Sequence, residues 1–291
     1  MIAPGTSTFE RVIVGVDGRA GGRDAIALAR LLVARDGRLT LVHVHAGEST
    51  RAGIPVLATD QGAHDDALAL LERERAAAAV EGDTVAIAAP SVGRGLHDLA
   101  EALGAELLVV GSCARGFAGR VLLGNDTRAA LSGAPCAVAV APLGYDHDLG
   151  RLHTVGVGFD GSPESEAALG LARAIAAGHD ARVRALAVVQ IPASPWAGFA
   201  GSAWGTALDE VMAGTRRQLE GLDGVAGEAV IGIAGEELAA FGDHVGLLVV
   251  GSRGYGPVRR MMFGSTSEYL AGHARCPLLV LPRAVAQGAA T

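Results

Sequence analysis

The chain has 291 residues, half of them apolar, and a formal net charge of −7. This length predicts two domains of ordinary size. The acidic balance argues against nucleic acid as a partner, because a phosphate backbone requires clustered positive charge. Every basic residue is arginine, and the lack of lysine excludes Schiff-base chemistry and the lysine of a Walker-type phosphate loop.

Targeting and metal signals are missing from the sequence. Residues 1–11 lack a basic segment followed by an apolar one, and no apolar run approaches the ~18 residues that a membrane span needs. The three cysteines lack the spacing of a zinc site or a disulfide framework. His43 and His45 share one face of a predicted strand without a third ligand nearby. We expect a cytoplasmic protein without a membrane segment or a metal site.

Short runs of valine, isoleucine and leucine alternate with stretches of helical period, for example at 22–35 and 163–177. Buried parallel strands joined by crossover helices give this pattern. Each half is therefore predicted to be a doubly wound α/β domain, with an open five-stranded parallel sheet and helices on both faces. The predicted strands are 11–16, 39–44, 84–88, 106–110 and 137–140 in the first half, and 154–159, 183–189, 228–233, 247–250 and 278–281 in the second.

The second half of the sequence repeats the first. RVIVGVDG at 11–18 matches TVGVGFDG at 154–161, and ELLVVGS at 106–112 matches GLLVVGS at 246–252. The matches keep their order and a nearly constant offset, which indicates a tandem repeat. We place the domains at residues 1–145 and 151–285. In the second copy, Ser162 is a predicted helix N-cap and Pro163 suits the first helical turn.

A glycine-rich loop with the sequence GSRGYGPVRRMMFGSTSE follows the fourth strand of the second half. Its glycines permit positive φ and a close approach of phosphate to the main chain. Ser265 and Glu268 predict a capping box that starts a helix, whose dipole favours anions. A glycine-rich surface turn is the alternative interpretation. The predicted phosphate contacts are Gly251, Arg253, Gly254, Gly264, Ser265, Thr266 and Ser267.

The spacing Gly-x2-Gly-x9-Gly-Ser at 251–265, with the earlier Asp-Gly-Ser at 160–162, resembles the ATP-binding branch of the universal stress protein family. The resemblance covers almost the whole chain, as a tandem two-domain member. It implies that Asp160 and Val188 contact the base and the ribose. It also implies a stress-linked homodimer in which ATP, with or without Mg²⁺, alters conformation or assembly.

The corresponding loop of the first half departs from this pattern. Ala114 replaces the second glycine, and Asn125 replaces the serine of the Gly-Ser pair. Asp126 places a carboxylate at the helix N-terminus, where it would repel an anion. We therefore expect the first half to bind nucleotide weakly or not at all. The retained positions of the pattern are Asp17, Val44, Gly111 and Gly124.

Three functions are compatible with the sequence. We favour an ATP- or adenine-nucleotide-binding stress-response or signalling protein with little or no turnover, because nothing in the phosphate loop supplies a general base for water. The second is a slow ATPase or phosphotransfer enzyme, in which the loop arginines and Mg²⁺ would stabilise the transferred phosphoryl group. The third is a nucleotide-independent dimerisation module.

Overall fold

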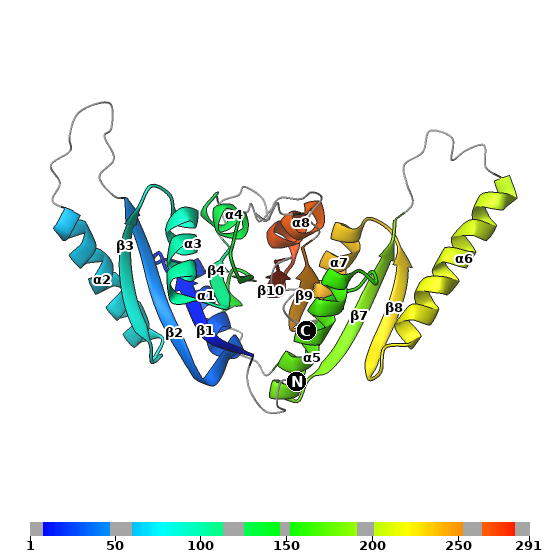
Figure 1. The fold of residues 1–291 in the computed structure, drawn as a ribbon, viewed down its shortest axis with the longest axis horizontal. Coiled ribbons are helices and arrows are strands. Elements are labelled where there is room, and N and C mark those ends of the chain that lie inside the picture. The colour runs from blue at the N-terminus through cyan, green and yellow to red at the C-terminus, as the bar shows by residue number, and fades with distance from the viewer. Residues whose placement is uncertain are drawn as a thin grey trace.

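A computed structural model describes residues 8–46, 60–112, 125–145, 152–190, 201–252 and 264–282. Strands and helices alternate through both halves (Figure 1). The first half contains β1 Phe9–Gly15, α1 Ala20–Leu32, β2 Val33–Ala46, α2 Asp60–Ala77, β3 Asp83–Ala89, α3 Val92–Leu103, β4 Leu107–Gly111, α4 Asn125–Leu131 and β5 Ala137–Ala141. The second half contains β6 Thr154–Gly158, α5 Pro163–His179, β7 Arg182–Val189, α6 Gly201–Glu220, β8 Val225–Ile231, α7 Ala234–Gly242, β9 Leu247–Gly251, α8 Ser265–His273 and β10 Leu278–Leu281.

The predicted architecture is confirmed within each half. The strand order is β3-β2-β1-β4-β5 in the first half and β8-β7-β6-β9-β10 in the second, and all pairs within a half are parallel. The most buried strands are almost purely aliphatic, as LLVVG in both β4 and β9 illustrates. Such runs are typical of parallel strands that are covered on both faces.

The two halves join into one ten-stranded sheet. Strand β10 pairs with β5 in antiparallel register, with Leu278 opposite Val140 and Val280 opposite Val138. The sequence predicted two separate sheets and did not indicate this pairing. Without this pairing, β5 and β10 would each be an exposed edge of a sheet. The pairing satisfies their main-chain donors and acceptors, which could otherwise pair with a strand of another chain.

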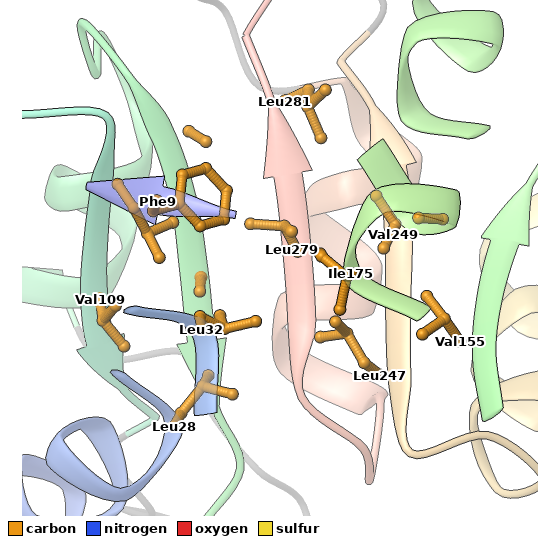
Figure 2. Packing of buried hydrophobic residues seen from close by; sticks show 14 of the residues in the cluster. Phe9, Leu28, Leu32, Val109, Val155, Ile175, Leu247, Val249, Leu279 and Leu281 are labelled. Carbon is orange, nitrogen blue, oxygen red and sulfur yellow. The ribbon is translucent and has the colours of Figure 1, made fainter. Parts of the chain in front are cut away.

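The hydrophobic core also runs across the junction. One face of the sheet packs against α1, α2, α5 and α6, and the opposite face packs against α3, α4, α7 and α8. Figure 2 shows Leu279 of β10 between side chains of the first half, such as Phe9 and Leu32, and side chains of the second, such as Ile175 and Leu247. The two halves therefore bury apolar surface against each other in addition to sharing a strand pair.

Some element boundaries differ from the prediction. Helix α1 ends at Leu32 rather than near residue 35, because Val33 is already extended (φ −69°, ψ 139°). Strand β2 starts at Val33, six residues early, and its register against β1 shifts between Phe9 and Arg11. Among the described residues, no helix combines the length and apolar character needed to cross a bilayer.

Candidate functional site

Each half places a cavity at the carboxyl ends of its strands. The cavities lie where the strand order reverses, beside β1 and β4 in the first half and beside β6 and β9 in the second. Doubly wound sheets bind ligands at this position because the crossover helices diverge to opposite faces there. The fold thus provides two candidate sites related by the repeat.

The cavity of the second half has a volume of about 510 Å³. Its lining comes from the ends of β6, β7 and β9 and from the first turns of α5, α7 and α8. The lining residues are Gly158, Phe159, Asp160, Ser162, Glu164, Ser165, Leu186, Val188, Gln190, Ala234, Leu238, Val250, Gly251, Gly264, Ser265, Thr266 and Ser267. The structure therefore gathers around one cavity all predicted contacts of the second half that fall within the described residues.

One end of this cavity is polar and lies at the N-terminus of α8. Ser265, Thr266 and Ser267 form the first turn of that helix, and Ser267 is buried. Main-chain N–H groups in the first turn of a helix lack partners within the helix, and the helix dipole adds partial positive charge there. This end of the cavity therefore has the donors that an anion requires.

The predicted capping box at this helix is wrong. Helix α8 begins at Ser265, and its N-cap is Gly264, which is extended (φ −65°, ψ 147°) and provides no side-chain hydrogen bond. Ser265 is thus the first helical residue rather than the cap. With Gly264 as the N-cap, Glu268 is the fourth helical residue rather than the third, and its carboxylate pairs with Arg128 of α4 at 2.9 Å.

Gly251, at the end of β9, is held close to α5. A Cβ atom at this position would lie 2.7 Å from the main-chain oxygen of Glu164. In the first half, a Cβ atom on Gly111 would lie even closer to the main-chain oxygen of Gly21. Both halves therefore require glycine here for close helix–strand packing, quite apart from any ligand.

Asp160 lies in a tight turn between β6 and α5. Its Oδ1 accepts hydrogen bonds from the main-chain N–H of Ser162, at 3.0 Å, and from the Ser162 hydroxyl. Ser162 is the N-cap of α5, as predicted, and its Oγ accepts from the N–H of Ser165 at 3.2 Å. Gly161 follows with φ +74°, a left-handed conformation that favours glycine. This network fixes an exposed carboxylate at the rim of the cavity.

Strand β7 extends beyond the end of β6 and contributes main-chain groups to the cavity. Pairing with β6 stops at Leu186, whose oxygen accepts from the N–H of Phe159 at 2.9 Å. The oxygen of Val189 points to the opposite side of β7, toward β8, and accepts from the N–H of Gly232. Because successive residues of a strand direct their N–H and C=O groups to opposite sides, Val188 directs both groups toward the space beyond β6.

The cavity of the first half is much smaller, at about 80 Å³, and mostly apolar. Asp17, Val44 and Gly111 line it, so three of the four positions predicted there are brought together. Val92 and His43 line it where the repeat places Ala234 and Ala187 in the second half. His43 Nδ1 also lies 2.7 Å from the Val16 oxygen, which holds the ring in place.

The carboxylate and hydroxyl groups of the first cavity are engaged by protein atoms. Asp17 Oδ1 accepts from the N–H of Arg19 at 3.0 Å, and the Arg19 guanidinium lies 3.9 Å from its other oxygen. The Thr127 hydroxyl donates to the Gly111 oxygen at 2.9 Å. Asp160 of the second half is held by the equivalent turn, so size is the main difference between the two cavities.

Several predicted positions lie outside the described residues. These are Arg253 and Gly254 of the second half and Ala114 and Gly124 of the first. Helix α4 begins at Asn125, but the side chains of Asn125 and Asp126 are also outside the description. The roles expected of these residues remain predictions from the sequence.

Sequence reasoning missed part of the lining. Glu164 and Ser165 enter from α5, Gln190 follows β7, and Ala234 and Leu238 come from α7. The period-two alternation of a strand could have identified Gln190, because Leu186, Val188 and Gln190 share one face of β7. The contribution of α7 depends on how that helix crosses the sheet, and nothing local in its sequence indicates this.

Two of the three cysteines are unsuited to nucleophilic chemistry. Burial raises the pKa of Cys136 and the pKa of Cys276 to about 12 each. At neutral pH both side chains are therefore uncharged thiols, whereas the thiolate is the nucleophile. They pack in the core on the face covered by α4 and α8.

Known proteins resemble this chain over two thirds of its length or more. Universal stress protein Rv2623 of Mycobacterium tuberculosis is 30% identical over 296 residues, which cover 92% of this chain and 95% of that protein. Universal stress protein Mb2346c of Mycobacterium bovis is 29% identical over 204 residues, covering 66% and 69%, respectively. Both relatives are universal stress proteins.

Solved structures share the fold at lower identity. A universal stress protein from Archaeoglobus fulgidus DSM 4304 has a TM-score of 0.63 and 17% identity, covering 94% of this chain and 98% of its own. Protein PA1789 of Pseudomonas aeruginosa PAO1 has a TM-score of 0.65 and 14% identity, covering 97% and 96%. The model of the universal stress protein family matches residues 8–142 and again 151–282. The chain therefore belongs to the universal stress protein family and contains two of its domains in tandem.

Proposed function

We propose that the cavity of the second half binds an adenine nucleotide, ATP with or without Mg²⁺, and holds it with little or no turnover. This proposal rests mainly on one observation: the N-terminus of α8 and the carboxyl ends of β6 and β7 line the same cavity. Its volume of about 510 Å³ falls within the range of roughly 300–1,000 Å³ typical of small-molecule sites.

The phosphates are assigned to the polar end of the cavity. Gly251 and Gly264 leave the main chain accessible, and the first turn of α8 supplies N–H groups and the hydroxyls of Ser265, Thr266 and Ser267. Arg253 and Gly254 belong to the proposed site from the sequence pattern. In a chain without lysine, these N–H groups, hydroxyls and arginines replace the ammonium group of other phosphate loops.

The base is assigned to the opposite wall, which is apolar. Leu186, Val188, Ala234, Leu238 and Val250 form this wall, and burying a flat heterocycle against them is favourable. The N–H and C=O groups of Val188 match the N1 acceptor and N6 donor of adenine. Guanine would not match these groups, because it carries a donor at N1 and an acceptor at O6. The carboxylate of Asp160 can accept hydrogen bonds from the ribose hydroxyls.

A slow ATPase is the second candidate function, and one observation favours it. Glu164 lines the same cavity, at the start of α5 and beside Gly251. A carboxylate in this position could accept a proton from the attacking water, a role that the phosphate loop itself does not provide. A turnover assay of the unaltered chain against Glu164→Gln decides between the candidates, because only an enzyme that uses Glu164 loses phosphate release.

Assembly as a homodimer also belongs to the proposal. Strands β5 and β10 pair with each other within one chain, so a dimer of chains would have to use another surface. Light scattering with and without ATP tests both the dimer and its dependence on nucleotide. A single mass equal to one chain under both conditions contradicts this part of the proposal.

Equilibrium binding of ATP tests the main proposal. The triple variant Ser265→Ala, Thr266→Ala, Ser267→Ala should weaken ATP binding about tenfold or more, because it removes three donors at the phosphate end. Thr215→Ala in α6 is the control, since Thr215 does not line the cavity and its hydroxyl donates to the Val211 oxygen of its own helix. Failure of the unaltered chain to bind ATP, with no adenylate detected by mass spectrometry of the purified protein, refutes the proposal and leaves the dimerisation module.

A further inference from the structure

Gln190 is placed to contact whatever lies on the apolar wall of the second cavity. It is the residue after β7, it lines the cavity, and it is exposed to solvent. Leu186 and Val188 precede it at intervals of two and line the same cavity. Because side chains alternate across a strand, the Gln190 carboxamide continues the wall on the face where these two residues lie.

The carboxamide is also available for a ligand. Within the part of the chain that the structure describes, Gln190 makes no side-chain hydrogen bond. A carboxamide carries an acceptor oxygen and a two-proton donor side by side. Gln190 follows β7, whereas α8 follows β9, and β6 lies between these two strands in the sheet. The repeat places Ala46, which has no such group, at this position in the first half.

We propose that Gln190 strengthens the base specificity of the second site, beside the main chain of Val188, by binding the N6 and N7 edge of adenine. Glutamine pairs with this edge through one donated and one accepted hydrogen bond, whereas the corresponding edge of guanine presents two acceptors, O6 and N7. One proton of N6 would bond to Val188 and the other to Gln190. The inference rests on the proposed function, because it requires a nucleotide base on this wall.

Three variants at one position test the inference in the full-length chain. Gln190→Leu retains the bulk of the side chain without the amide, and Gln190→Ala introduces the residue of the first half. Gln190→Arg replaces the carboxamide with a group that donates twice and therefore suits guanine. Binding of ATP and GTP is measured by calorimetry, and competition by inorganic tripolyphosphate measures the phosphate end separately.

The unaltered chain should prefer ATP over GTP. Gln190→Leu and Gln190→Ala should each lower ATP affinity about tenfold and leave GTP and tripolyphosphate binding unchanged. Gln190→Arg should shift the preference toward GTP. An ATP-to-GTP affinity ratio that is the same in the unaltered chain and in Gln190→Leu overturns the inference while the proposed function stands. If the unaltered chain binds neither nucleotide, both the proposed function and this inference fail.

Discussion

Arg128 Nη2 lies 2.9 Å from Glu268 Oε1, and the two residues occupy equivalent positions of the repeat. Arg128 is in the first turn of α4 and Glu268 is in the first turn of α8. The ion pair therefore joins these two helices of different halves, which Figure 1 shows near each other. The preceding residues, Thr127 and Ser267, line the first and the second cavity, respectively. If the two halves had the same residue at this position, two like charges would meet. The Arg128–Glu268 pair therefore favours contact of a first half with a second half.

The ion pair should contribute little to stability but be sensitive to charge reversal. Its side chains are 59% and 46% exposed, and exposed pairs typically contribute about 0.2–1 kcal/mol. Arg128→Ala should lower the free energy of unfolding by no more than this, whereas Arg128→Glu should lower it further through repulsion of Glu268. Urea denaturation of a double-mutant cycle measures the coupling. The swapped double variant Arg128→Glu, Glu268→Arg should recover most of the loss, and a swap no more stable than Arg128→Glu argues against a direct interaction.

Each chain should bind one nucleotide. The first cavity measures about 80 Å³ and the second about 510 Å³, and Val92 lines the first cavity where the repeat has Ala234 in the second. Calorimetric titration with ATP should therefore give a stoichiometry near one per chain, and the triple α8 variant should weaken this binding about tenfold or more. Two sites of equal affinity would contradict the asymmetry that we infer from the cavities.

Gly251→Ala should damage both folding and binding. The added methyl would meet the Glu164 oxygen at 2.7 Å, so β9 and α5 must separate at the mouth of the cavity. Overpacking of this kind costs about 1–3 kcal/mol, and ATP affinity should fall with it. Chemical denaturation and calorimetry give the two quantities.

Gly170→Ala is the matched control for Gly251→Ala. Gly170 is exposed within α5, and a Cβ atom there would meet nothing within 4 Å. Because alanine is favoured over glycine in a helix by about 0.5–1 kcal/mol, this variant should be more stable than the unaltered chain and bind ATP equally well. A loss of stability in Gly170→Ala that matches Gly251→Ala would show that the space beside Gly251 is not the cause.

The two buried thiols should destabilise the fold at high pH. Burial raises the pKa of Cys136 and the pKa of Cys276 from 9.0 to about 12. The unfolded chain ionises above pH 9 while the folded chain holds the protons, so the associated stability is complete below pH 9 and is lost as the pH rises toward 12. Urea denaturation between pH 8 and 11 should show a shallower decline in Cys136→Ala than in the unaltered chain. Parallel declines would show that the thiols do not control the effect.

The same burial predicts slow thiol modification in the folded state. At pH 8, alkylation followed by peptide mapping should leave Cys136 and Cys276 unmodified until urea is added, because the protonated thiol is a poor nucleophile. Rapid labelling of either residue without urea would contradict its burial of more than nine-tenths.

Local sequence patterns were sufficient to predict the elements and most of the candidate phosphate end. Aliphatic runs such as LLVVG at 107–111 predict buried strands from local composition, and the repeat doubles every such signal. Ser162 and Pro163 predict the start of α5 because N-capping is a local hydrogen-bonding property. The residues Gly264, Ser265, Thr266 and Ser267 are adjacent in sequence, so their common location at one helix terminus was also predictable.

The way in which these elements come together could not be predicted from local patterns. The β5–β10 pairing, the shared cores and the Arg128–Glu268 pair depend on contacts between distant residues, which no local pattern specifies. The sequence also misassigned Ser265 and Glu268 to a capping box, whereas the N-cap is Gly264 and Glu268 pairs with Arg128 of the other half. The unequal volumes of the two cavities, and the entry of Glu164, Gln190 and Leu238 into the larger one, follow from the packing of α5, β7 and α7 around a common edge of the sheet.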